Sequence, residues 1–247
     1  RTMGSQMLSG KNLDSKWIGF FDKNIYQIDF PYPWLKESKD KIFFYNSLRK
    51  RFAKNFDYKK KITMIILESF QGWGAIFYPK NYVKEIEKFC LKNNILLCFD
   101  EMQSGFARTG KKFGFEHYGV KPDLICCGKG MGSGSPLSGI IGSNKIFKNK
   151  NIFGMSSTHS ANPLSCAAGL ATIKIIEKLN LIKNSKKQGI LLHKNLEILK
   201  RKYHKIILNS YGKGLIGSLL FKKFKNFSGK HIADKVTLKC LLKGLLI

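Results

Sequence analysis

The sequence predicts an α/β fold in which a mostly parallel sheet is flanked by helices. Three observations lead to this prediction. Apolar runs occur in residues 62–67, 95–99 and 123–129, and their length is typical of strands buried on both faces. Residues 80–94 place their apolar side chains on one face of a helix. The resulting alternation of strand, helix and strand favours parallel strands joined by right-handed crossovers.

The remaining segments predict the rest of the large domain and the beginning of a second, smaller one. Apolar periodicity and turn residues indicate further strands and helices; the strands are 137–141, 206–208 and 215–221, and the helices are 43–56, 163–179, 180–203 and 231–243. We expect residues 1–180 to form a large domain. We expect residues 181–247 to form part of a smaller α+β C-terminal domain.

The positive charge of the chain allows two interpretations: a nucleic-acid partner, or lysines that are simply exposed to solvent. Its 247 residues carry a formal net charge of +28, which would ordinarily indicate a nucleic-acid partner. The basic residues, however, are mostly lysines spread along the chain, and residues 95–142 are close to neutral. Arginine, which nucleic-acid-reading proteins use heavily, is scarce. We therefore expect solvated surface lysines and no specific nucleic-acid partner, and keep a polyanion-binding module as an alternative.

Cysteine usage and hydropathy indicate a cytoplasmic protein. None of the six cysteines has the CxxC spacing of a zinc or redox site, so we expect no metal. Several lie in apolar runs, where free cysteine packs as a small hydrophobe, and this suits a reducing compartment. No run approaches the roughly 20 apolar residues of a membrane helix, and no signal peptide is visible.

Two ionisable residues lie where apolar runs end. Asp100 follows residues 95–99, and Lys129 ends the run 123–129 just before a glycine-rich loop. Ligands of open α/β sheets bind beyond the carboxyl ends of the strands, so the two residues define a candidate site. A desolvated lysine can form a Schiff base, and a carboxylate can hold a protonated ring nitrogen, as in pyridoxal phosphate enzymes. Alternatively, Asp100 caps a helix and Lys129 forms an ordinary ion pair.

Two longer motifs surround these residues. Residues 99–110 have the sequence FDEMQSGFARTG, and residues 119–123 have the sequence GVKPD and lead to KGMG, which begins at Lys129. Both motifs resemble those of the class III pyridoxal-phosphate-dependent aminotransferases, with the family's aspartate and lysine falling on Asp100 and Lys129. The resemblance covers nearly the whole chain. It implies the large domain of that fold, with pyridoxal 5'-phosphate as the cofactor.

The resemblance implies further cofactor contacts. Gln103 would donate a hydrogen bond to the ring oxygen of the cofactor. Thr158, placed by its spacing to Asn162, would donate to the cofactor phosphate of the neighbouring subunit in a homodimer. A hydroxyl beside a helix start suits phosphate binding in its own right. Ser160 or Asn162 would cap the same helix, and His159 is expected to be structural.

Glu68 follows the first apolar run and begins a segment that resembles the family's Glu-Pro-x-x-Gly-x-Gly loop. Ser69 replaces its proline. Trp73 stands where several members carry a second glutamate, which neutralises a substrate-binding arginine. Trp73 cannot do this, so it suggests an amino donor with an apolar or bulky part; alternatively it packs at a subunit contact.

Other parts of the family pattern fall outside the sequence. The aromatic residue that stacks on the cofactor and the loop that binds its phosphate would precede Arg1, and the substrate-carboxylate arginine would follow Ile247. We therefore expect a fragment of a longer enzyme that neither folds nor works alone. Arg108 and Lys111 are expected only to hold their loop.

The most direct functional prediction is transamination between an amino donor and a 2-oxo acid. Lys129 would hold the cofactor as a Schiff base and act as the base and acid, while Asp100 keeps the ring nitrogen protonated. An aminomutase or a decarboxylase on the same scaffold is the alternative, because a fold does not fix a reaction. Residues 128–139 fit neither GxGxxG nor the phosphate-binding GxxxxGK[ST] pattern, which excludes a nucleotide site of those types.

Overall fold

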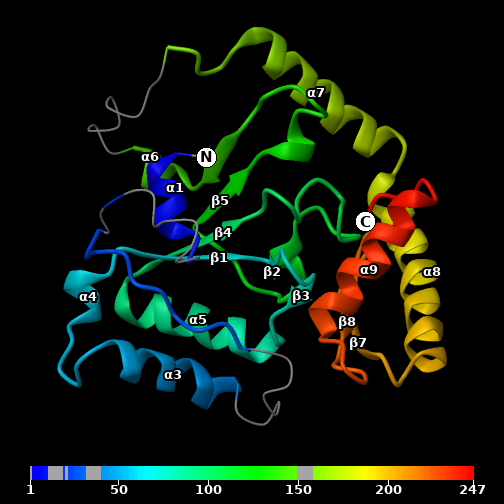
Figure 1. The fold of residues 1–247 in the computed structure, drawn as a ribbon. Coiled ribbons are helices and arrows are strands. Elements are labelled where there is room, and N and C mark those ends of the chain that lie inside the picture. Colours follow the sequence, from blue (N-terminus) through cyan, green and yellow to red (C-terminus); the bar gives the residue numbers. More distant parts are fainter. Residues whose placement is uncertain (1, 11–18, 20–21, 32–39, 149–157) are drawn as a thin grey trace. The chain divides into compact units, whose positions relative to one another are not determined.

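The computed structural model describes residues 2–10, 19, 22–31, 40–148 and 158–247. The chain divides into two compact units, residues 1–61 and residues 62–247. In the first unit the described helices are α1 (Met3–Leu8), α3 (Asp40–Arg51) and α4 (Tyr58–Lys61) (Figure 1).

Helix α3 ends before the boundary that its sequence pattern predicts, because the aromatic residues that follow it pack elsewhere. The rings of Phe52 and Phe56 lie 4.3 Å apart. Phe52 also contacts Tyr26, with ring centroids 4.8 Å apart, and Phe56 contacts Tyr58 at 5.1 Å. The apolar spacing that suggested another helical turn therefore belongs to an aromatic cluster.

The second unit is built on a four-stranded sheet with the order β1-β4-β5-β6. Strands β1 (Met64–Glu68), β4 (Leu96–Asp100) and β5 (Leu124–Cys127) are parallel, and β6 (Gly139–Gly142) is antiparallel to β5 at the edge. The prediction of a mostly parallel sheet flanked by helices is confirmed.

Strand β4 forms the centre of the core. Leu97, Cys98 and Phe99 are at most 2% exposed, whereas β1 and β5 are only partly buried, less than their apolar runs predict. Helix α5 (Lys80–Asn93) connects β1 to β4 and covers one face of the sheet (Figure 1). It ends at Asn94, whose left-handed conformation (φ 55°) turns the chain into β4.

The connection from β4 to β5 contains a short 3-10 helix, η3 (Gly114–His117), and no α-helix. Two very short strands, β2 (Phe70–Gln71) and β3 (Ile76–Phe77), form a hairpin after β1. Helix α6 (Asn144–Phe147) follows β6. These pieces are too short for the sequence pattern to reveal them, yet β2, β3 and the β4–β5 connection surround the candidate site.

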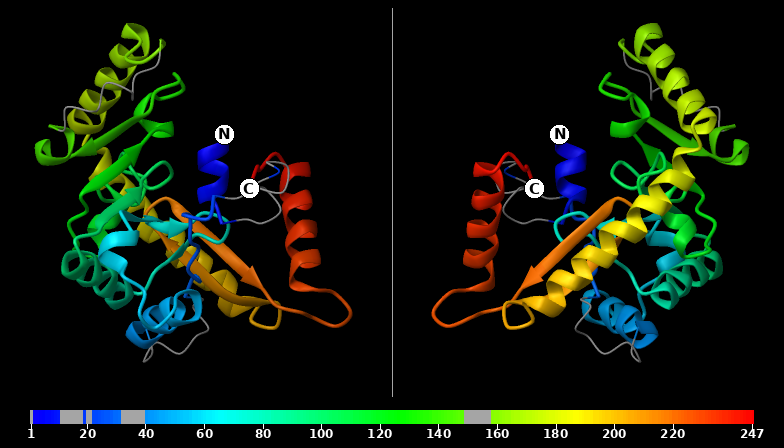
Figure 2. Two further views of the ribbon diagram at one scale, coloured as in Figure 1. Left: turned by 90° about the vertical axis from the view of Figure 1, so that its left-hand side faces the viewer. Right: turned by 90° about the vertical axis from the view of Figure 1, so that its right-hand side faces the viewer.

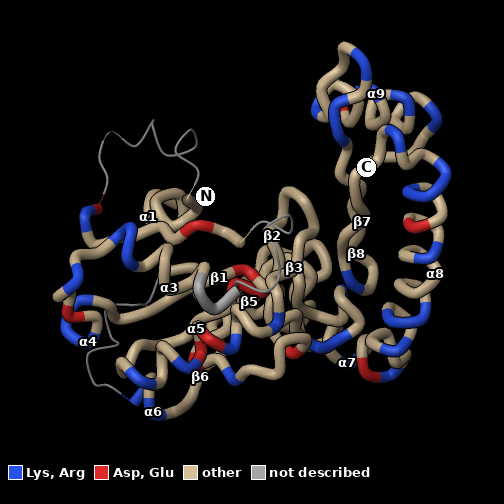
Figure 3. Tube along the Cα trace, turned by 90° about the horizontal axis from the view of Figure 1, so that it is seen from below, with Lys and Arg blue, Asp and Glu red and all other residues tan. Residues whose placement is uncertain are grey.

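The C-terminal part of this unit pairs a hairpin with long helices. The described elements are α7 (Pro163–Lys178), α8 (Leu181–Lys202), β7 (Ile207–Lys213), β8 (Ile216–Phe221) and α9 (Gly229–Leu242). Figure 2 shows the β7–β8 hairpin lying along α8. Lysine and arginine recur along α8 and α9 (Figure 3). None of the helices within the described ranges has the length and apolar character of a membrane span.

Glycines allow three segments to meet closely where this hairpin turns. A β-carbon added at Gly189 of α8 would lie 2.6 Å from the Cα of Gly214, between β7 and β8. A β-carbon added at Gly214 would lie 2.3 Å from the carbonyl carbon of Thr109. The hairpin is thereby held against the loop that follows β4, and Leu215 N donates to Arg108 O over 3.0 Å.

Candidate active site

The site begins with two carboxylates at neighbouring strand ends. Glu68 is the last residue of β1 and Asp100 the last residue of β4, and the two are paired in the parallel register. Register partners project from the same face of a sheet, so the carboxylates lie side by side. Burial raises the pKa of Glu68, and the negative charge of Asp100 raises it further.

Gln103 approaches these carboxylates from the loop after β4. Its Nε2 donates to Glu68 Oε1 over 3.4 Å, and the amide N–H of Met102 donates to Asp100 Oδ1 over 3.0 Å. Gly72 makes room for this approach, because a β-carbon there would lie 2.6 Å from Gln103 Nε2. The small residue in the loop after Glu68 thus lets the Gln103 side chain lie directly against the backbone.

Lys129 lies just beyond the carboxyl end of β5, at the start of the short 3-10 helix η4 (Lys129–Met131). Its backbone is left-handed (φ 45°), a conformation that is uncommon for a residue other than glycine and that often marks functional positions. The side chain is exposed, and its amine makes no hydrogen bond or ion pair within the described part of the chain. Its charge lowers the pKa of Glu68, which therefore interacts with both Asp100 and Lys129.

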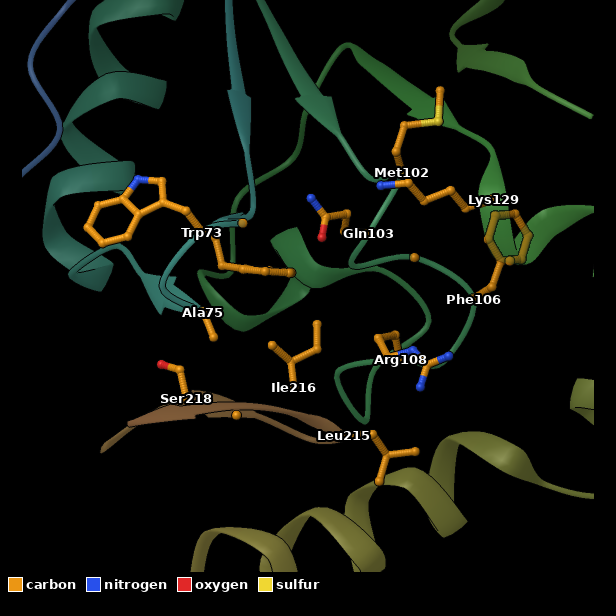
Figure 4. A pocket seen from close by; sticks show the side chains of 15 residues that line it. Trp73, Ala75, Met102, Gln103, Phe106, Arg108, Lys129, Leu215, Ile216 and Ser218 are labelled. Atoms are coloured by element: carbon orange, nitrogen blue, oxygen red, sulfur yellow. The ribbon is translucent and has the colours of Figure 1, made fainter. Parts of the chain in front are cut away.

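A cavity of about 530 Å³ adjoins these groups, a size typical of small-molecule sites. Fifteen residues line it, and they include Gln103 and Lys129. In the view of Figure 4, Trp73 lies at the end opposite Lys129, and strand β8 closes a further side. Trp73 is 54% exposed, so it lies at the rim, as its place in the sequence suggests.

A buried carboxylate beside Asp100 holds the strand ends in place. Glu101 is fully buried and accepts four hydrogen bonds. The amides of Gly114 and Phe115 donate over 2.7 and 2.9 Å, Ser104 Oγ donates over 2.7 Å, and Ser69 Oγ also donates. We call these five residues the Glu101 network. They join the ends of β1 and β4 to η3.

Ser69 is anchored twice, because its carbonyl oxygen also accepts a hydrogen bond from the hydroxyl of Tyr118. The same hydroxyl accepts from the amide of Tyr78 over 3.1 Å. Burial raises the pKa of Tyr118, so this phenol stays neutral. A proline at position 69, as in the family loop, has no side-chain hydroxyl. The Ser69 contact to Glu101 is thus a feature of this chain that sequence reasoning missed.

Thr158 lies apart from the cavity. It is exposed in the turn before α7 and is not among the residues that line the cavity. Asn162 caps α7, because its Oδ1 accepts hydrogen bonds from the amides of Leu164 and Ser165 over 3.0 and 3.3 Å. The capping role is confirmed, and a phosphate contact made by Thr158 stays a prediction.

Several of the cysteines pack in the core. All six are free, and burial raises the pKa of Cys127 to about 11. The sulfur atoms of Cys98 and Cys126 are 3.7 Å apart on neighbouring strands. Among the described residues, no group of three or more histidine, cysteine, aspartate or glutamate side chains is arranged to hold a metal ion.

The mostly parallel sheet, with Asp100 at the end of β4 and Lys129 just beyond β5, has the fold of solved aminotransferases. The family model described as aminotransferase class III matches residues 1–247. The chain therefore belongs to the class III aminotransferases.

Individual relatives support the same assignment. The chain is 37% identical over 190 residues to an acetylornithine aminotransferase of Caldanaerobacter subterraneus subsp. tengcongensis. The aligned residues are 76% of this chain and 46% of that protein. The chain is also 37% identical over 166 residues to a putrescine aminotransferase of Pectobacterium atrosepticum, covering 66% of this chain and 36% of that one. Its structure resembles that of a Bacillus anthracis aminotransferase with a TM-score of 0.83 and 29% identity, over 100% of this chain and 58% of that chain. The chain thus spans less than half of the curated relatives it matches.

Proposed function

We propose that the protein is a pyridoxal-phosphate-dependent aminotransferase that moves an amino group between an amino donor and a 2-oxo acid. One observation carries the proposal: Asp100 ends β4, and Lys129 follows the neighbouring parallel strand β5 and lines the cavity. Family membership supports it.

The residues at the site fit the cofactor. The Lys129 amine is exposed and without a hydrogen bond or ion pair to the described residues, so it is available to a carbonyl. Asp100 offers a carboxylate whose Oδ1 is oriented by the Met102 amide, and Gln103 offers a side-chain amide. Gly128, next to Lys129, leaves room for the Met102 side chain, because a β-carbon there would lie 2.3 Å from Met102 Sδ.

When bound, pyridoxal phosphate would supply a carbonyl for the Lys129 amine and a ring that accepts electrons. Asp100 would hold a proton on the ring nitrogen, as an ionised acid does beside a basic ring. The Gln103 amide would donate to the ring oxygen. Once the amine of the substrate has taken its place on that carbonyl carbon, the freed Lys129 Nζ would remove a proton from the substrate carbon and deliver it to the cofactor carbon, as general base and then general acid.

We propose substrate and assembly roles for three more residues. Trp73 lies at the rim of the cavity and favours an amino donor with an apolar or bulky part, and Glu68, beside Asp100 at the strand ends, would lie near the substrate. The related acetylornithine and putrescine aminotransferases are named for amines on aliphatic chains, which suits this rim. Thr158, exposed outside the cavity, would serve the cofactor phosphate of the second subunit in a homodimer. The boundary between residues 180 and 181 and the cytoplasmic location also stay predictions.

The test is chemical labelling of Lys129. The full-length protein, produced with pyridoxal phosphate, would be reduced with borohydride, digested and mapped. We expect the label on Lys129, and none in Lys129→Ala, whereas Lys112→Ala, which removes another exposed lysine, should label normally. A label on a different lysine would overturn the assignment. Mixing the loaded protein with an amino donor alone should give about one keto product per site; carbon dioxide or an isomerised amine would favour the alternative reactions.

A further inference from the structure

Strand β8 forms one wall of the cavity that Lys129 lines. Four consecutive residues of this wall line the cavity: Leu215, Ile216, Gly217 and Ser218. The proposed function assigns no role to them, although they come from a part of the chain far from the other lining residues. The side chain of Ile216 is the apolar group that projects from the middle of this wall (Figure 4).

The two faces of β8 have different neighbours, because successive side chains of a strand point in opposite directions. A β-carbon added at Gly217 would lie 2.7 Å from Leu196 Cδ1, so that face of β8 packs closely against α8. Ile216 and Ser218 project from the opposite face, and both line the cavity. Figure 4 shows the Ile216 side chain directed from the strand into the cavity, between Leu215 and Ser218.

Hydrogen bonds hold β8 in place on both sides of Ile216. Before it, Leu215 N donates to Arg108 O over 3.0 Å, in the loop after β4. After it, Ser218 Oγ donates to Gly74 O, in the loop between β2 and β3. The Ile216 side chain is itself stiff, because its branch at Cβ restricts χ1. A fixed backbone and a stiff side chain leave this wall little freedom to move away from a bulky ligand.

We propose that Ile216 determines substrate specificity, because it limits the width of the carbon chain that an amino donor can carry. The inference rests on the proposed function and adds the shape of the donor to it. Lys129 and Trp73 lie at opposite ends of the cavity in Figure 4, so a donor bound beside Lys129 extends past β8 toward Trp73. An unbranched aliphatic chain passes Ile216, whereas a ring meets it. One methylene group too many in an apolar pocket changes selectivity by about 10- to 200-fold.

The test uses two conjugates of the cofactor with an amine, each reduced with borohydride beforehand so that it binds without reacting. One conjugate carries a hexyl tail and the other a cyclohexylmethyl tail, and the pyridoxal phosphate part is the same in both. Their Kd values are measured by fluorescence on the full-length protein after its cofactor has been removed. We expect the unchanged protein to bind the hexyl conjugate at least about 10-fold more tightly, because the ring meets Ile216.

Substitutions on the two faces of β8 locate the cause of this preference. Ile216→Ala should reduce it to about twofold or less by strengthening the binding of the ring conjugate, and Ile216→Val should fall between. Leu219→Ala is the matched control, because Leu219 lies on the face of β8 that packs against α8 and does not line the cavity. It should keep the full preference. The same preference in Ile216→Ala as in the unchanged protein, or an equal loss in Leu219→Ala, would overturn the inference.

Failure of the inference is distinguishable from failure of the proposed function. If neither conjugate bound the unchanged protein, the cofactor assignment would be wrong and the inference would be wrong with it. If the unchanged protein bound both conjugates equally well, or the ring conjugate more tightly, only the role of Ile216 would be wrong. Borohydride would still label Lys129 of the cofactor-loaded protein in that case.

Discussion

The buried side of the site and its cavity side differ in whether their charged side chains make hydrogen bonds to the protein. On the buried side, the fully buried Glu101 receives four hydrogen bonds from the protein. On the cavity side, Lys129 and Arg108 are exposed, and neither side chain has a hydrogen bond or ion pair to the described residues. A buried charge that accepts hydrogen bonds from the protein stabilises the fold, whereas a charge exposed to solvent is available to a ligand.

Removing the buried charge should have the largest effect on stability. Glu101→Ala would leave the donors of Ser69, Ser104, Gly114 and Phe115 without their acceptor in a dry environment. We expect the free energy of unfolding to fall by about 3 kcal/mol or more, since each buried donor without a partner is costly. Urea denaturation of the full-length protein measures this.

Glu177→Ala is the matched control, because Glu177 is exposed on α7 and its removal should change the free energy of unfolding by less than about 0.5 kcal/mol. Equal losses in the two variants would mean that the Glu101 network does not hold the strand ends. Ser69→Ala should lose about 1 kcal/mol, and most of that loss should vanish when Glu101 is already alanine.

His117, the last residue of η3, makes the stability of the folded protein dependent on pH. Its Nε2 lies 3.2 Å from Thr109 O, in the loop that presents Arg108. Burial, then the charges of Lys213 and Lys111, lower the pKa of His117 from 6.5 to about 4. The unfolded chain binds this proton below about pH 6.5, and the folded protein only near pH 4. The contribution of the neutral His117 to the free energy of unfolding is therefore fully present above pH 6.5 and is lost as the pH falls from 6.5 toward 4.

We expect the unchanged protein to lose about 1 kcal/mol more than His117→Gln between pH 7 and pH 5, after allowing for solvent screening at this half-buried ring. Urea midpoints at the two pH values give the difference. His204→Gln, which removes an exposed histidine, should behave like the unchanged protein. A pH dependence that survives in His117→Gln would assign the effect to other groups.

The sequence predicts one of the two regions well. Asp100 and Lys129 are found because each interrupts an apolar run at the point where a parallel strand ends, and the register of β1, β4 and β5 confirms that geometry. Helix α5 is likewise predicted within a residue of its bounds, because its buried face follows helical periodicity.

The rest of the site could not be predicted because its contacts are not local in sequence. Glu101 follows Asp100 as one more polar residue, and three of its donors come from Ser69, Gly114 and Phe115, 13 to 32 residues away. The cavity position of Arg108 depends on the close approach of Gly214 to the loop after β4. Only the proline replaced at position 69 could have signalled an unusual contact, and it does not identify the acceptor.

The smallest expected change in the free energy of unfolding concerns the two exposed cations on the cavity side. Lys129 and Arg108 are exposed to solvent, so their removal should not cost stability in the protein without cofactor. We expect Lys129→Ala and Arg108→Gln to change the free energy of unfolding by less than about 0.5 kcal/mol, because neither side chain has a partner to lose among the described residues. In a chain of net charge +28, losing a positive charge also reduces self-repulsion, so a small gain is the expected sign at low salt. Urea denaturation at low and high salt separates these contributions, since salt should suppress only the electrostatic gain. If either variant lowered the free energy of unfolding by about 2 kcal/mol, that cation would contribute to stability as Glu101 does, and the two regions would not differ in this respect.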